Sequence, residues 1–273
     1  MHNASTMSPL AATLLDAYDR GRPLAPAAGS DAPLDAARAY ALAAELIAAR
    51  TARGERLAGR KIGFTNRSIW PVYGVDGPIW GAVWDTTLVQ LDGTEASVSL
   101  RGLVEPRLEP EIVLGLREAP RSDAPDDLAR AVGWVAHGLE IVQSLHPGWR
   151  FAAPDTVAAF GLHARLIVGP RTPVRAADAP TLAARLAAAR VSLLLDGRPI
   201  AQGRGADALG GPLEALGFLV RTLSAQPLAP PLRAGESVTT GTLTDAQPLV
   251  PGQRWSTRIE GAGLAGLELR VTS

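Results

Sequence analysis

The chain has no cysteine, one lysine and no net charge. Without cysteine there is no disulfide framework, no thiolate nucleophile and no zinc–thiolate site, so oxygen and imidazole ligands remain for a metal, which favours hard cations. The 27 basic residues are balanced by 27 acidic ones and form no dense cluster, so nucleic acid is not an expected partner. No apolar run approaches the roughly 20 residues that span a bilayer, and we expect no membrane segment.

The overall composition is that of a globular protein. With 273 residues, 47% hydrophobic and 20% charged, the chain can bury a large core and falls outside the disordered and disulfide-stapled classes. Its first residues, Met1-His2-Asn3-Ala4-Ser5, show no basic segment followed by an apolar stretch. We therefore expect no secretory signal and a cytoplasmic protein.

Lys61 is the single lysine among the 27 basic residues, and all the others are arginine. A partly buried amine can lose its proton, whereas a guanidinium does not do so at useful pH. A lone lysine in such a sequence suggests a chemical task that arginine cannot perform. The alternative interpretation is that one lysine has survived by chance in an arginine-biased sequence.

Hydrophobic periodicity predicts an α+β protein. Helices are expected at residues 9–18, 34–53, 181–190 and 212–223, with a helical turn near 154–160 and a surface loop at 118–127. Strands are expected at residues 61–64, 87–91, 97–100, 108–116, 134–142, 164–168, 191–195, 237–243, 256–259 and 267–271. The pattern predicts a helical amino-terminal region at 1–58 and a β-rich core at 59–273, which together form one compact unit.

Two carboxylates, Glu109 and Glu111, stand two residues apart in the apolar segment Leu108-Glu109-Pro110-Glu111-Ile112-Val113-Leu114. In a strand, this spacing points both side chains to the same face. A divalent cation would compensate two like charges there, and carboxylate ligands suit magnesium or manganese. The alternative is a solvent-facing pair on an edge strand, which Pro110 would also tolerate.

Glu140 supplies a possible third ligand from the apolar segment 135–142. An isolated buried carboxylate is costly, and facing the first two around a cation would remove that cost. His137 lies three residues earlier, so we expect it on the opposite face as a packed or hydrogen-bonded core residue. His146 and His163 lie in loop or loop-edge sequence and are interpreted as structural.

Several motifs together resemble a known family. In order and spacing they are similar to those of the 2-oxopent-4-enoate hydratase and 4-oxalocrotonate decarboxylase group of the fumarylacetoacetate hydrolase superfamily, over nearly the whole chain. The fold implied is a mixed β-roll with a helical amino-terminal region. The motifs are Gly59-Arg60-Lys61-Ile62-Gly63-Phe64-Thr65, Gly74-Val75-Asp76, Glu109-Pro110-Glu111, Gly138-Leu139-Glu140-Ile141-Val142 and residues 237–248.

The resemblance implies a role for five side chains. Glu109, Glu111 and Glu140 would hold Mg²⁺ or Mn²⁺, and Lys61 and Asp76 would line the same pocket as catalytic residues. Lys61 could act as a cation that orients substrate or as a proton shuttle, because burial lowers the pKa of an amine. Asp76 could act in acid–base chemistry or orient Lys61, or it could be a turn-forming aspartate.

The resemblance also places substrate contacts near the carboxyl terminus. Gly241, Thr242 and Thr244 would help hold the substrate carboxylate, and a homo-oligomer is implied. The chain departs from the family where many members have an acidic residue in place of Gln143. It also departs at 155–163, where the corresponding polar run of several relatives is replaced by apolar residues, which puts the substrate and the handling of water in question.

The implied activity is that of a metal-dependent lyase acting on a small unsaturated 2-oxo acid. A hydratase would add water to a 2-hydroxy-2,4-dienoate through a metal-stabilised dienolate. A 4-oxalocrotonate-type decarboxylase would use the same electron sink, and an acylpyruvate hydrolase is a third alternative. A non-catalytic subunit that binds an oxo acid is the alternative from another class.

Overall fold

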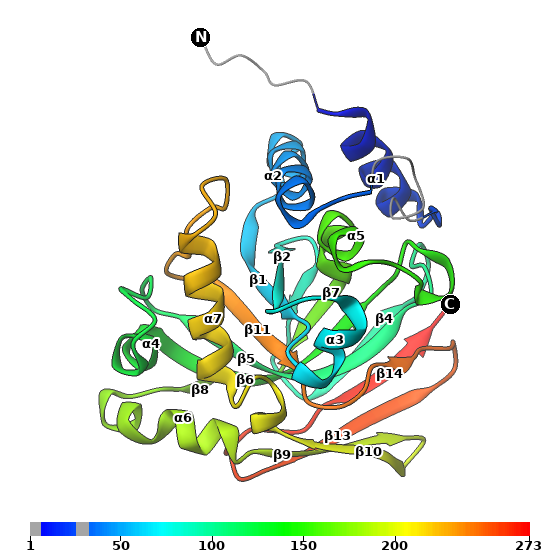
Figure 1. The fold of residues 1–273 in the computed structure, drawn as a ribbon. Coiled ribbons are helices and arrows are strands. Elements are labelled where there is room, and N and C mark those ends of the chain that lie inside the picture. The colour runs from blue at the N-terminus through cyan, green and yellow to red at the C-terminus, as the bar shows by residue number, and fades with distance from the viewer. Residues whose placement is uncertain (1–6, 26–32) are drawn as a thin grey trace.

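The computed structural model describes residues 7–25 and 33–273 (Figure 1). The first five residues, used above to argue against a secretory signal, lie outside these ranges. The helices are α1 (Pro9–Arg20), α2 (Ala36–Ala52), α3 (Trp70–Tyr73), α4 (Pro125–Ala131), α5 (Ala153–Ala158), α6 (Ala179–Ala187) and α7 (Pro212–Ser224). In the described part of the chain, no helix is long and apolar enough to cross a membrane.

The strands form two sheets. They are β1 (Leu57–Gly63), β2 (Ile79–Trp84), β3 (Leu88–Gln90), β4 (Glu95–Ser99), β5 (Arg107–Leu116), β6 (Val132–Val142), β7 (His163–Val168), β8 (Thr172–Pro173), β9 (Arg190–Leu195), β10 (Arg198–Arg204), β11 (Ser237–Thr242), β12 (Gln247–Pro248), β13 (Arg254–Glu260) and β14 (Glu268–Thr272). The larger sheet has the order β2-β1-β11-β5-β6-β7-β3, with β12 paired to β5 and β8 to β6. The smaller has the order β10-β9-β13-β14-β4.

The larger sheet is mixed and curled. Strand β1 runs parallel to β11, whereas β5 is antiparallel to β11 and to β6. Val83 of β2, Val113 of β5 and Leu166 of β7 share one buried cluster, although β2 and β7 are far apart in the strand order. The sheet therefore bends until these strands enclose an inner face, which is the face that carries Glu109 and Glu111.

The outer face of the larger sheet is covered by two different layers. Helices α4, α6 and α7 bury a leucine-rich surface against β5 and β6, with Leu128, Leu186 and Leu216 in one cluster with Ile112 (Figure 1). Toward the other end of β5 the smaller sheet replaces the helices, and Trp255 packs in a cluster with neighbouring strands. Each such side chain contributes about 1.5–3 kcal/mol on burial, so the two long central strands are firmly held.

The amino-terminal helices have clear start signals. The Ser8 side chain accepts a hydrogen bond from the Ala11 N–H at the start of α1, and Asp35 caps α2 in the same way. Helix α2 packs against α1 and α5 (Figure 1). Strand β1 begins at Leu57, within the expected amino-terminal region, and the division at residue 58 stays a prediction.

The structure corrects some predicted elements. The loop expected at 118–127 ends in α4, which begins at Pro125, and the helix expected at 181–190 ends at Ala187 so that β9 begins at Arg190. Strands β2 and β10 and the short helix α3 were not predicted. Strand β10 is mostly exposed and contains proline and glycine, so it lacks the alternation of a half-buried strand, and pairing with β9 holds it in place.

Candidate metal centre

Three carboxylates converge on the inner face of the larger sheet. Glu109 and Glu111 share a face of β5, as their spacing predicted, and Glu140 of β6 lies directly opposite Glu109 in the antiparallel register. One carboxylate oxygen from each residue can be chosen so that the three atoms lie within 4.8 Å of one another. Glu111 and Glu140 are fully buried, and Glu109 is partly exposed.

The Glu111 carboxylate is anchored through one oxygen. Its Oε2 accepts hydrogen bonds from the Thr239 hydroxyl and, at 2.8 Å, from the Gly241 backbone N–H, both on the neighbouring strand β11. Its other oxygen, Oε1, is buried and has no hydrogen-bond partner among the described residues. A buried, unpaired carboxylate oxygen is costly, and it is the kind of atom that a cation would satisfy.

Glu140 is held in a similar manner by residues on two other strands. Its Oε1 accepts a hydrogen bond from His163 Nδ1 at 2.8 Å, and its Oε2 lies 3.2 Å from Lys61 Nζ. The His163 ring is buried, and its Nε2 lies 2.8 Å from the Thr87 hydroxyl oxygen. Because an ionised carboxylate only accepts hydrogen bonds, Nδ1 carries the proton of the neutral ring and Nε2 accepts one from Thr87.

Lys61 reaches the carboxylates through a narrow space between two glycines. It lies on β1 opposite Gly81 of β2, and its side chain is 4% exposed. A Cβ on Gly81 would lie 3.3 Å from Lys61 Cγ, and one on Gly161 would lie 3.3 Å from Lys61 Cδ. The absence of side chains at both positions leaves room for the lysine stem, so its amine is directed to the carboxylate cluster.

The charged groups of the cluster change one another's pKa values. Burial opposes the charge on Lys61, but the three carboxylates outweigh it and raise the pKa of the amine. Burial also opposes ionisation of Glu140, yet Lys61 and His163 lower the pKa of that carboxyl to about 2. Burial raises the pKa of Glu109 to about 7 and that of Glu111 well above its usual value, with the neighbouring carboxylates adding to both shifts. One lysine therefore does not compensate the charges of three carboxylates, two of which are fully buried.

The residues present fit a divalent cation. All three donors are carboxylate oxygens, which suit magnesium, manganese or calcium rather than soft metals. The hydrogen bonds to Glu111 and Glu140 hold one oxygen of each carboxylate, which leaves the other available to the cluster. In the described part of the chain this is the one group of three or more potential ligands that could hold a metal ion.

Comparisons with known proteins place the chain in a family. No family model matches it. It is 31% identical over 257 residues to the 2-hydroxyhexa-2,4-dienoate hydratase of Comamonas testosteroni, covering 93% of this chain and 94% of that protein. It is 33% identical over 257 residues to the 2-keto-4-pentenoate hydratase of Paraburkholderia xenovorans, covering 93% and 91%. The chain belongs to the 2-keto-4-pentenoate hydratase family. The resemblance inferred from the sequence motifs is thereby confirmed.

Solved structures confirm the fold class. The 4-oxalocrotonate decarboxylase from Pseudomonas putida G7, complexed with magnesium and adipate, superposes with a TM-score of 0.88 at 24% identity and covers 99% of both chains. A fumarylpyruvate hydrolase from Pseudomonas aeruginosa, in complex with Mn²⁺ and pyruvate, gives a TM-score of 0.56 at 18% identity, covering 78% of this chain and 88% of that chain. At sequence identities of 24% and 18%, these structural similarities show that the fold is shared.

Asp76 is not brought to the carboxylate cluster in this hydratase family member. It lies exposed in the loop between α3 and β2, and within residues 7–25 and 33–273 no hydrogen bond or ion pair joins it to the carboxylates. Its catalytic role stays a prediction. Its exposed place in a loop also agrees with the alternative interpretation of a turn-forming aspartate.

The carboxy-terminal segment 241–244, for which the resemblance implied substrate contacts, also contacts the carboxylate cluster. The Gly241 N–H donates to Glu111, and the Thr242 hydroxyl donates to the Thr244 carbonyl at 2.6 Å. Gly241 has φ +102°, and a Cβ there would lie 2.1 Å from Thr65 Oγ1, so glycine is required at this bend. Contact of these residues with a substrate stays a prediction.

Sequence reasoning did not find the residues that anchor the carboxylates. Thr87, Thr239 and His163 each bond to a proposed metal ligand or to the partner of one. Thr87 and His163 lie outside the family motifs, and Thr239 lies in the motif at 237–248, to which only substrate contacts were assigned. The interpretation of His163 as a purely structural loop-edge residue missed its bond to Glu140. His137, by contrast, faces away from the cluster as predicted, with its ring nitrogens bonded to the Glu111 carbonyl and the Thr257 hydroxyl.

Proposed function

We propose that this family member is a divalent-metal-dependent hydratase of a 2-hydroxy-2,4-dienoate, with Glu109, Glu111 and Glu140 as the metal ligands. The observation that carries the proposal is the convergence of these three buried or half-buried carboxylates beside one buried lysine. The names of the relatives at 31–33% identity support the reaction class. Mg²⁺ is the expected ion, with Mn²⁺ as an alternative that the same oxygen ligands accept.

The reaction adds one water molecule to the dienol. Transfer of the 2-hydroxyl proton to C5 gives the 2-oxo-3-enoate, and water then adds across the C3–C4 double bond, with its oxygen on C4 and a proton on C3. A divalent ion at the three carboxylates would stabilise negative charge that develops on the 2-oxo oxygen. The resulting 4-hydroxy-2-oxo acid contains the dienol plus one water.

Lys61 is suited to act as a cation. The three carboxylates raise the pKa of its amine, so Nζ keeps its proton near neutral pH. As an ammonium group it would bind the substrate carboxylate or 2-oxo oxygen and hold it against the carboxylate cluster. A Schiff base would need the free amine, so this role is disfavoured. Burial by itself lowers the pKa of Lys61, as the sequence suggested, but in the metal-free protein the three carboxylate charges outweigh burial.

The test is an ultraviolet assay of metal-free protein with freshly generated 2-hydroxypenta-2,4-dienoate, with and without Mg²⁺. The variants are Glu109→Gln and Lys61→Arg, and Glu95→Gln on the exposed face of β4 is the matched control. We expect metal-dependent loss of dienoate absorbance in wild type and in the control. Both site variants should lose most of this activity, Glu109→Gln because it removes a ligand charge and Lys61→Arg because the larger guanidinium does not fit the narrow space beside Gly81 and Gly161.

The alternative functions are distinguished by offering other substrates to the same protein. Turnover of 4-oxalocrotonate or an acylpyruvate, with the dienoate left unchanged, would replace the hydratase proposal with a decarboxylase or a hydrolase. Tight Mg²⁺ binding without turnover of any of these compounds would indicate a non-catalytic oxo-acid-binding subunit. We also expect a homo-oligomer, as the family resemblance implies, and light scattering coupled to size exclusion measures its mass.

A further inference from the structure

His163 joins the proposed metal centre to a separate network of polar contacts. It is the first residue of β7, it is 1% exposed, and both of its ring nitrogens are bonded. Nδ1 lies 2.8 Å from Glu140 Oε1, and Nε2 lies 2.8 Å from Thr87 Oγ1. The ring therefore has one fixed orientation, and rotating it would break both contacts inside the protein.

The hydrogen bonds through this ring run in one direction. The Trp84 backbone N–H donates to the Thr87 hydroxyl at 3.1 Å, the hydroxyl donates to His163 Nε2, and Nδ1–H donates to Glu140. The Trp84 carbonyl lies farther from the Thr87 hydroxyl, at 3.2 Å. Aligned hydrogen bonds in a buried environment polarise one another, so the bond to the carboxylate is strengthened.

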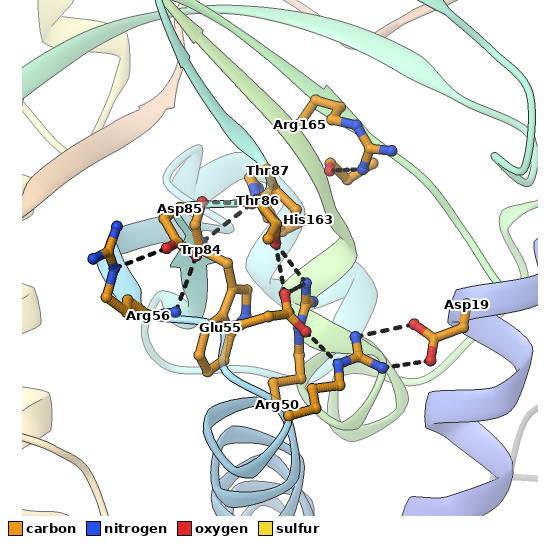
Figure 2. A network of polar contacts seen from close by, with 12 residues as sticks. Asp19, Arg50, Glu55, Arg56, Trp84, Asp85, Thr86, Thr87, His163 and Arg165 are labelled. Atoms are coloured by element: carbon orange, nitrogen blue, oxygen red, sulfur yellow. Dashed lines mark hydrogen bonds and ion pairs between the residues drawn. The ribbon is translucent and has the colours of Figure 1, made fainter.

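The Thr87 end of this series of hydrogen bonds is held in place by further polar contacts, which Figure 2 shows. Thr86, next to Thr87, donates to Glu55 at 2.6 Å, and Glu55 is bonded by the buried guanidinium of Arg50. The Arg50 guanidinium also lies over the Trp84 ring, 4.9 Å from its centroid. The turn between β2 and β3 is thus fixed against α2, which gives His163 a rigid support.

We propose that His163, held by Thr87, positions the Glu140 carboxylate and so sets the affinity of the three-carboxylate site for its divalent ion. This inference rests on the proposed metal centre. Without the Nδ1–H bond, Oε1 of Glu140 would lose its partner, and the carboxylate could rotate toward Lys61. Partners that orient a metal ligand typically change metal affinity by about 10- to 100-fold when they are removed.

Two variants separate the two sides of the ring. In His163→Asn the side-chain amide nitrogen can take the place of Nδ1 and donate to Glu140, whereas in His163→Gln the longer side chain places its amide toward Thr87 and away from that carboxylate. Thr87→Val removes the hydroxyl that supports the ring but keeps its volume. Mn²⁺ affinity is measured from the electron paramagnetic resonance signal of the free ion, without substrate, and thermal unfolding checks that each variant is folded.

We expect His163→Gln to weaken Mn²⁺ binding by about 10- to 100-fold, His163→Asn to stay within about threefold of wild type, and Thr87→Val to fall between them. Equal affinities of wild type and a folded His163→Gln variant would overturn the role of His163. If His163→Gln does not fold, the test rests on Thr87→Val, and a Mn²⁺ affinity equal to that of wild type in this variant would overturn the role of His163. Absence of Mn²⁺ binding by wild-type protein would overturn the metal centre itself, and this inference with it.

Discussion

Thr239→Val tests whether the hydrogen bonds of β11 prepare Glu111 for a metal. The Thr239 hydroxyl and the Gly241 N–H both donate to Glu111 Oε2, and Oε1 faces the cluster without a partner. Valine has nearly the same shape as threonine but lacks the hydroxyl. The variant therefore removes one of the two hydrogen bonds and leaves the packing largely unchanged.

The expected magnitude follows from the charge of the acceptor. A hydrogen bond to a charged group contributes about 1.5–3 kcal/mol, and each 1.4 kcal/mol is tenfold in an equilibrium constant. The Gly241 N–H remains in place, so we expect the lower part of this range. The Kd for Mn²⁺ should rise by about tenfold in Thr239→Val, measured by calorimetric titration of metal-free protein at pH 7.5.

The next residue of β11 provides a matched control. Thr240 is as deeply buried as Thr239, but its hydroxyl donates to the Ile112 carbonyl at 2.9 Å instead of to a carboxylate. Thr240→Val should lower the free energy of unfolding by about 1 kcal/mol and leave Mn²⁺ affinity unchanged. If the two variants bind Mn²⁺ equally well, the anchoring of Glu111 by Thr239 has no effect on the metal, and the reasoning is refuted.

Three further predictions follow from the same structure. Gly241→Ala should weaken Mn²⁺ binding at least as much as Thr239→Val, because the new Cβ would collide with Thr65 and displace the N–H that holds Glu111; unchanged affinity would contradict this. Burial would raise the pKa of Glu55, but its bonds to neighbouring arginines and a threonine outweigh burial and lower the pKa from 4.5 to about 2. Its stabilising contribution is complete above pH 4.5 and is lost as pH falls toward 2, so Glu55→Gln should lower the free energy of unfolding by on the order of 3 kcal/mol at pH 7. Measured by urea unfolding, the difference in free energy of unfolding between wild type and Glu55→Gln should become smaller below pH 4.5. A difference that does not change with pH would argue that the ionised carboxylate is not its source. Lys61→Met removes the one cation of the cluster, so Mg²⁺ should raise the melting temperature more in this variant than in wild type; an equal or smaller rise would count against charge compensation by Lys61.

The sequence alone determined the elements that depend on local periodicity. The long apolar strands β5 and β6, the amphipathic helix α7 and the pairing of Glu109 with Glu111 on one face follow from side-chain spacing, and the structure agrees. The lack of cysteine limited a metal to oxygen and imidazole ligands, and the motifs indicated the family. These features need no knowledge of which strands are neighbours.

Tertiary structure decided which residues meet. The register that sets Glu140 opposite Glu109, the approach of Lys61 from β1, and the contacts of Thr239 and His163 depend on pairings between segments far apart in the chain. The hydrophobic pattern of a strand indicates which of its faces is buried, but the neighbour of each strand depends on how distant segments pack together, so the pattern of one segment does not identify its partner. Spacing could identify the carboxylates, but only the folded sheet shows how each one is held.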